Sequence, residues 1–132
     1  MPFRATCNTF ILKDDSKVRI IKFHKDYFDE FYSKQRPNVK AKIVRTILLI
    51  EKLKIVPIKF LKHLTGTKGL YEIRIKSGTD IYRIFCFFYK IELLILVNGF
   101  QKKTQKTPKK EIEKALRIKQ EYFEYKRKGN KK

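Results

Sequence analysis

Apolar residues in the first half of the chain follow a strand-like pattern and then two helical ones. Residues 18–23 (VRIIKF) are typical of a short strand, and the aromatic side chains of residues 24–32 recur at helical spacing. Pro37 suits the first turn of a second helix, in which apolar side chains recur every three or four positions. Because Val56 precedes a proline, which disfavours helical geometry, we expect this helix to end near Ile55.

The second half of the chain predicts three strands and one more helix. After a loop at residues 57–69, apolar positions indicate three strands joined by short turns, at residues 71–76, 81–89 and 92–97. The third run is almost continuously apolar, as expected of a central strand covered on both faces. A last helix should begin around Pro108, with Thr107 as its N-cap.

These elements predict an α+β domain in which helices pack on one face of a small antiparallel sheet. The order is strand, two helices, three strands and helix. We expect the domain to span residues 18–125, with residues 1–17 as an extension and residues 126–132 as a basic tail. At 132 residues the chain is long enough for a real core, and no repeat or linker divides it.

The charge of the chain restricts its partners. The formal net charge is +20, from 33 basic and 13 acidic residues, which favours nucleic acid, an anionic membrane or an acidic protein. The apolar run at residues 43–50 is far shorter than the roughly 20 residues of a membrane span. Residues 1–17 also lack the apolar core of a secretory signal, so we expect a cytoplasmic protein without membrane contact.

Common catalytic and metal-binding motifs do not occur in this sequence. It contains no Walker loop, GxGxxG, HExxH or CxxC pattern, so no metal and no cofactor are expected. Cys7 and Cys86 have no metal-type spacing, and Cys86 should be a buried thiol in an apolar strand.

The candidate site is a set of cations on and after the three predicted strands. Strand alternation places Arg74 opposite the apolar face, and Arg83 sits among apolar residues of the next strand. Alternatively, Arg74 is a solvated strand residue and Arg83 forms a salt bridge, for example to Glu72. More basic and amide groups follow where the sheet ends and a helix begins, a place that favours anions: Lys102, Lys103, Gln105 and Lys106.

Three segments of the chain resemble the RelE/ParE superfamily of toxins, and the phage-derived, HigB-like branch in particular. They are FHKDYFDEFY, LYEIRIKSGTDIYRIFCFF and NGFQKKTQKTPKKEIEKA. The resemblance covers residues 18–125 and implies a RelE-like fold. It also implies a toxin of a type II toxin–antitoxin system that acts as a metal-independent endonuclease on ribosome-bound mRNA. The implied partner is an antitoxin, often a helix-turn-helix protein in this branch.

The resemblance also implies roles for single residues. Arg74 and Arg83 match positions that contact the scissile phosphate, and Lys102 and Lys103 match further basic positions. Glu72 departs from the RelE branch, where lysine is frequent, and is either a general base or a brace for Arg74. The residues expected to bind RNA are Glu72, Lys76, Gln105, Lys106 and Lys68. The catalytic tyrosine of some branches has no secure match, because Tyr122 and Tyr125 are expected to be packing residues.

Two other functions remain open at this point. A ParE-type inhibitor of DNA gyrase shares the fold, although it needs no centre for phosphate transfer. A non-catalytic module would bind RNA with a strong salt dependence and leave the strand intact.

Overall fold

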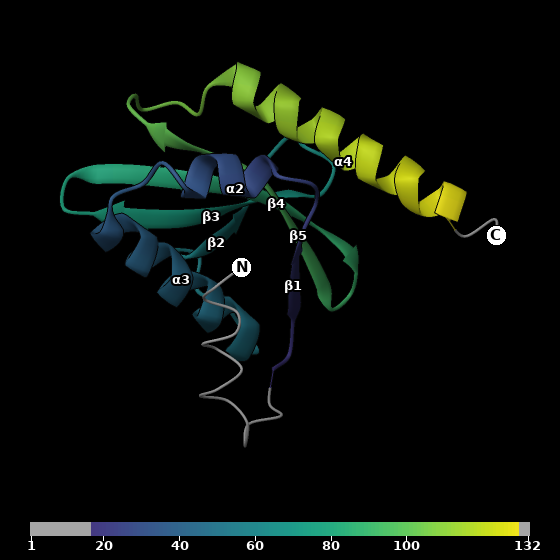
Figure 1. Cartoon of the computed structure of the whole chain (residues 1–132), viewed down its shortest axis with the longest axis horizontal. Coiled ribbons are helices and arrows are strands. Elements are labelled where there is room, and N and C mark those ends of the chain that lie inside the picture. The colour runs from purple at the N-terminus through teal and green to yellow at the C-terminus, as the bar shows by residue number, and fades with distance from the viewer. Residues whose placement is uncertain (1–16, 130–132) are drawn as a thin grey trace.

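The computed structural model describes residues 17–129, which form a five-stranded sheet with helices on both faces (Figure 1). The predicted α+β class is confirmed, and the predicted elements occur in the predicted order with one further strand, β2. Residues 1–16 and 130–132, and with them most of the predicted extension and the end of the tail, lie outside the described residues. The elements are β1 Ile20–Phe23, α2 Tyr27–Tyr32, α3 Pro37–Lys52, β2 Leu61–His63, β3 Leu70–Ser77, β4 Asp80–Lys90, β5 Leu93–Lys102 and α4 Lys109–Gly129.

The sheet has the strand order β1-β5-β4-β3-β2 and is mixed. Strands β2 to β5 pair antiparallel, whereas β1 runs parallel to β5, so the prediction of a purely antiparallel sheet was wrong at one edge. Residues 61–63, predicted to lie in a loop, form the other edge as strand β2. A strand of 3 residues is too short to show an alternation of apolar and polar positions, so no sequence signal predicted it.

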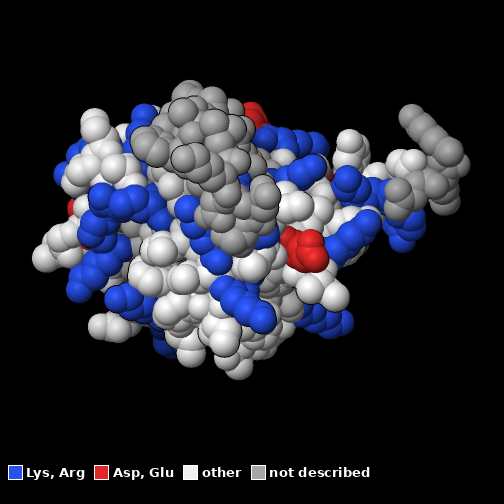
Figure 2. Space-filling view, turned by 90° about the horizontal axis from the view of Figure 1, so that it is seen from below, with Lys and Arg blue, Asp and Glu red and all other residues white. Residues whose placement is uncertain are grey.

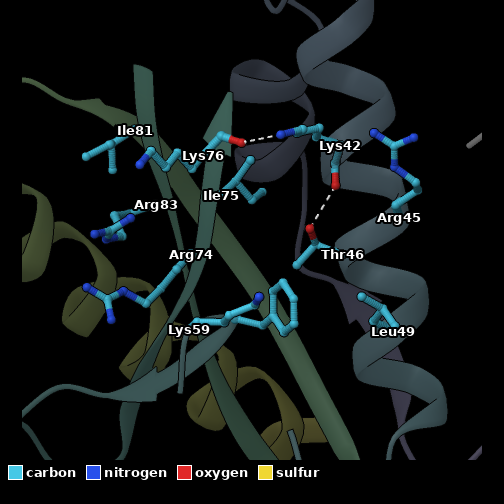
Figure 3. Close-up of a pocket in the computed structure, with 11 residues that line it drawn as sticks. Lys42, Arg45, Thr46, Leu49, Lys59, Arg74, Ile75, Lys76, Ile81 and Arg83 are labelled. Carbon is cyan, nitrogen blue, oxygen red and sulfur yellow. Dashed lines mark hydrogen bonds between the residues drawn. The ribbon is translucent and has the colours of Figure 1, made fainter. Parts of the chain in front are cut away.

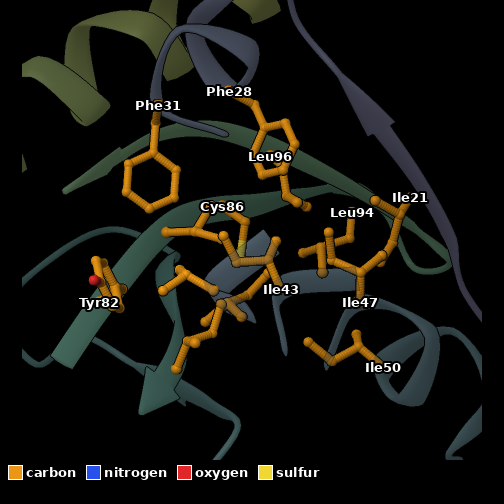
Figure 4. Packing of buried hydrophobic residues seen from close by; sticks show 14 residues of the cluster. Ile21, Phe28, Phe31, Ile43, Ile47, Ile50, Tyr82, Cys86, Leu94 and Leu96 are labelled. Atoms are coloured by element: carbon orange, nitrogen blue, oxygen red, sulfur yellow. The ribbon is translucent and has the colours of Figure 1, made fainter. Parts of the chain in front are cut away.

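The first face of the sheet is covered by α2 and α3. The apolar stripe of α3, including Ile43 and Ile47, belongs to the same buried cluster as Ile73 and Ile75 of β3. Figure 4 shows Ile43 and Ile47 within this cluster. Cys86 of β4 lies in the same cluster and is fully buried, as predicted. Arg19 holds the far end of α3, since its guanidinium donates hydrogen bonds to the carbonyl oxygens of Ile50, at 3.1 Å, and Leu53. A cation at a helix C-terminus is favourable because the last carbonyls have no partner within the helix.

The second face of the sheet is covered by α4, so the prediction of all helices on one face was wrong for this helix (Figure 1). Its buried residues Ala115, Ile118 and Tyr122 pack on Phe85 and Phe87 of β4. Strands β4 and β5 are therefore buried on both sides, as their apolar sequences require.

The last turns of α4 differ from two expectations. The helix continues through Lys126 to Gly129, so the first residues of the predicted tail are helical. Tyr122 is buried as expected, whereas Tyr125 is 63% exposed and is not a core residue. No helix among the described residues has the length and apolar character needed to cross a membrane.

Candidate active site

The alternation of β3 and β4 gathers three charged side chains on the sheet face that carries α4. Arg74 and Arg83 are paired directly across the two strands, and Glu72 pairs with Phe85. Since alternate residues of a strand share a face, Arg83 points to the same side as Phe85, which packs under α4. The predicted orientation of Arg74, opposite Ile73 and Ile75, is confirmed.

Glu72 lies between the two guanidinium groups. Its Oε2 is 3.4 Å from Arg74 Nε and 3.5 Å from Arg83 Nε. The side chains of Glu72 and Arg83 are 5% and 7% exposed, whereas that of Arg74 is 29% exposed. Arg83 thus forms the ion pair with Glu72 that was one of its two alternatives, and it also lines a groove. Its part in catalysis stays a prediction. Burial lowers the pKa of Arg83; Glu72 opposes this effect and Arg74 adds to it.

Lys102 joins this cluster from the end of β5. It pairs with Ile81, two residues before Arg83 on β4. Burial lowers the pKa of Lys102, and the positive charges of Arg83, Arg74 and Lys62 lower it further, while Glu72 raises it. Strands β3, β4 and β5 therefore contribute charges to one end of the sheet. We call the set Glu72, Arg74, Arg83 and Lys102 the cationic cluster.

Four other predicted site residues do not belong to the cationic cluster: Lys103, Gln105, Lys106 and Lys68. Lys103, Gln105 and Lys106 are exposed in the connection between β5 and α4, where Thr104 Oγ1 donates a hydrogen bond to the Lys106 carbonyl at 2.8 Å. Their part in binding stays a prediction. Lys68 lies beside α4, where its carbonyl accepts a hydrogen bond from Lys119.

A groove of about 540 Å³ adjoins the cluster at the edge of β3 (Figure 3). Arg74, Arg83 and the predicted Lys76 line it from the sheet. The rest of the lining comes from α3 and from the chain before β2: Lys42, Arg45, Thr46, Leu49, Lys59 and Phe60; Ile75 and Ile81 complete it.

Sequence reasoning missed the cations that α3 and the β2 region contribute. Lys42 and Arg45 are three positions apart, a spacing that places two side chains on one helical face, and this signal was available. No sequence signal indicated Lys59 and Lys62, because their positions depend on the unpredicted strand β2. Lys42 also joins α3 to the end of β3, since its Nζ donates a hydrogen bond to the Lys76 carbonyl at 2.7 Å.

The molecular surface is strongly basic. Figure 2 shows Lys and Arg spread over one face, with little acidic surface between them. Within residues 17–129 no group of three or more His, Cys, Asp or Glu side chains is arranged to hold a metal ion. The cationic cluster and the groove are suited to bind phosphate groups and to stabilise negative charge that develops on them.

Comparison with known proteins bears on the family. A search of curated proteins finds no significant match. A crystal structure of the archaeal RelE–RelB complex from Pyrococcus horikoshii OT3 is similar at 17% identity, with a TM-score of 0.46, over 68% of this chain and 99% of that one. Residues 28–120 match the family of phage derived proteins that are Gp49-like, a RelE-like toxin family, and this confirms the expected superfamily. The chain belongs to the Gp49-like family of phage-derived proteins.

Proposed function

We propose that this protein is the toxin of a type II toxin–antitoxin system and that it cleaves mRNA on the ribosome. The observation that carries this proposal is the convergence of Arg74, Arg83 and Lys102 from three strands around one buried carboxylate. A binding surface for nucleic acid needs no such buried arrangement, whereas a centre that stabilises a reacting phosphate does. Membership of a RelE-like toxin family supports the same function.

The reaction uses a nucleophile that the RNA itself carries. The 2′-oxygen attacks the adjacent phosphorus as its proton leaves, and the bond from phosphorus to the 5′-oxygen breaks. The 5′-oxygen takes up a proton, and the products are a 2′,3′-cyclic phosphate and a 5′-hydroxyl end. Because the nucleophile is internal, the protein has to align it and stabilise the added charge.

The arginines are proposed to perform the electrostatic part of this reaction. Arg74 is partly exposed and can reach a bound phosphate, while Arg83 is buried, is ion-paired with Glu72 and lines the groove. Cations fixed before the reaction require no reorganisation when charge develops on the phosphate, so they bind the transition state better than the substrate. Removal of one such contact typically lowers the rate by roughly 10²–10³.

The position of Glu72 supports a bracing role over that of a general base. One oxygen lies between two guanidinium groups, and the side chain is almost fully buried. It therefore fixes the arginines relative to each other. Lys102 and Lys103 are proposed to add positive charge, and Lys76, Gln105, Lys106 and Lys68 to bind RNA outside the reacting linkage.

An antitoxin is the proposed protein partner. A ribonuclease of net charge +20 would damage its host, so a neutralising protein with an acidic segment is expected. By the resemblance, this partner is a helix-turn-helix protein.

The test is induction of the chain in bacteria with and without the neighbouring gene, followed by translation reactions with purified protein. We expect growth arrest, mRNA cut inside translated frames with 2′,3′-cyclic phosphate ends, and rescue by the neighbour. Arg83→Ala should abolish cleavage while its circular dichroism stays native, and Arg117→Ala on the exposed side of α4 should cleave normally.

Other outcomes identify the competing functions. Inhibition of gyrase supercoiling with intact mRNA indicates a ParE-type toxin. Salt-dependent RNA binding without strand cleavage indicates a non-catalytic module. A native and active Arg83→Ala variant removes Arg83 from the site.

A further inference from the structure

The groove at the edge of β3 extends well beyond the residues proposed for catalysis. Strand β2 pairs with β3 only as far as Ile73, and the amide of Arg74 donates to the Phe60 carbonyl at 2.8 Å. Beyond Arg74, no strand among the described residues pairs with this edge of β3. The groove opens there, between the rest of β3 and helix α3 (Figure 3).

The lining combines positive charge with apolar surface. Six of the eleven lining residues are Lys or Arg, against 33 in 132 for the whole chain, and none of these eleven is acidic. Between the cations lie Leu49, Phe60, Ile75 and Ile81. Phosphate groups pair with Lys and Arg side chains, and nucleobases stack or pack on apolar ones.

We propose that this groove binds a stretch of single-stranded RNA that flanks the linkage to be cleaved. The inference rests on the proposed function at one point, since Arg74 and Arg83 belong both to the cationic cluster and to the groove. Arg45 and Lys59 then contact phosphates outside the reacting linkage. The side chains of Phe60 and Leu49 offer a place for a base.

The arrangement of the cations favours single-stranded over double-stranded RNA. Figure 3 shows Arg74 and Arg83 on one side of β3, with Lys42 and Arg45 on α3 at the other side. A backbone that contacts both sets must turn around the edge of β3. A flexible single strand follows such a path, whereas double-stranded RNA presents a long rigid surface. The volume of about 540 Å³ lies within the range of pockets that enclose a small molecule, and suits one or two nucleotides.

An added peptide strand is the alternative occupant, and the edge of β3 does not favour it. The exposed edge comprises only the last residues of β3, and the Lys76 carbonyl already accepts a hydrogen bond from Lys42 at 2.7 Å. Strand addition requires a row of unpaired backbone groups. Two kinds of lining, cationic and apolar, also match a nucleotide better than a purely acidic segment.

The test measures binding of a fluorescent 2′-O-methyl oligouridine, which cannot be cleaved, to the full chain at increasing salt. The groove variant is Arg45→Ala with Lys59→Ala; both residues are exposed and neither belongs to the cationic cluster. The matched control is Arg117→Ala with Lys22→Ala, on α4 and β1. The groove variant should bind at least about ten-fold more weakly, and its salt slope should fall by about 1.4 for two lost phosphate contacts. The control should stay within about two-fold of the unchanged protein.

A third variant tests the apolar part of the groove. Phe60→Leu keeps an apolar side chain at this position but removes the aromatic ring, and loss of one stacked base should weaken binding about ten-fold. Native circular dichroism is required of each variant. Groove variants that bind like the control overturn the inference.

The same variants separate this inference from the proposed function. If the chain never cleaves mRNA but the groove variant loses oligouridine affinity, the nuclease proposal fails and the RNA groove stands. If the groove variant keeps its RNA affinity and loses affinity for the neutralising partner, the groove is a protein-binding site and the RNA inference is overturned.

Discussion

Arg74 and Arg83 lie directly opposite each other on adjacent strands, although both carry positive charge. Like charges at paired positions of a sheet destabilise it, and burial of Arg83 adds the cost of removing a charge from water. Glu72 offsets this repulsion, with one oxygen within 3.5 Å of both side chains. The sheet therefore depends on the Glu72 side chain to keep two cations at paired positions.

Replacement of Glu72 by glutamine should expose that dependence. Glu72→Gln leaves a buried guanidinium without a counter-charge, which should lower the free energy of unfolding by about 3 kcal/mol in urea titrations. Glu113→Gln, at an exposed position of α4, is the matched control and should change it by less than about 0.5 kcal/mol. A variant of unchanged stability that no longer cleaves RNA would identify Glu72 as a general base instead of a brace.

Lys102 should affect activity and stability in opposite directions. Burial and then three neighbouring cations lower the pKa of Lys102 against the opposing effect of Glu72, so its charge is unfavourable in the folded protein. Lys102→Met removes this repulsion and keeps most of the aliphatic chain. We expect unchanged or higher stability, together with a loss of roughly 10² in cleavage rate, since a contact to the reacting phosphate disappears. If Lys102→Met instead lowers the cleavage rate only as far as it lowers the fraction of folded protein, Lys102 contributes to the fold and not to catalysis.

The sequence predicted the elements of this fold better than their arrangement. Alternation in β3 placed Arg74 correctly, because a strand has two faces and its period determines which side chains share one. It did not indicate that α4 covers the opposite face from α3, since an amphipathic helix specifies a buried stripe and not a partner. The cations that α3 and the chain before β2 add to the groove were missed, although the spacing of Lys42 and Arg45 indicated a shared helical face. Arg45 and Lys59 approach β3 only through the packing of α3 and the short strand β2.

Gly99 should tolerate no side chain, because Phe31 of α2 packs directly over it. A Cβ atom on Gly99 would lie 2.5 Å from Phe31 Cδ2. Gly99→Ala should therefore lower the free energy of unfolding by about 1–3 kcal/mol, as overpacking of a core does. A double-mutant cycle in urea checks the cause. The added Phe31→Leu should cost less in the Gly99→Ala background than alone, and strictly additive losses would contradict the contact.

Glu121 of α4 gives the folded protein a dependence on acid pH. Its Oε1 is 2.8 Å from His24 Nε2 and 3.2 Å from Lys25 Nζ, and it accepts a hydrogen bond from the Tyr27 hydroxyl at 3.4 Å. The hydrogen bond with His24 has the largest effect and lowers the pKa of this carboxyl below its ordinary value of 4.5; burial opposes it, and Lys25 lowers the pKa further. The ionised carboxylate thus joins α4 to the segment between β1 and α2.

A group with a lowered pKa in the folded state stabilises the protein above its ordinary pKa and loses this effect as the pH falls. The unfolding midpoint in urea should therefore be constant down to about pH 5 and fall below that value. Glu121→Gln should be less stable at neutral pH and should lose less stability in acid, whereas Glu113→Gln should follow the unchanged protein. Parallel pH profiles of Glu121→Gln and the unchanged protein would contradict this assignment. A loss confined to neutral pH would instead support it, because the variant has no carboxylate left to protonate at this position.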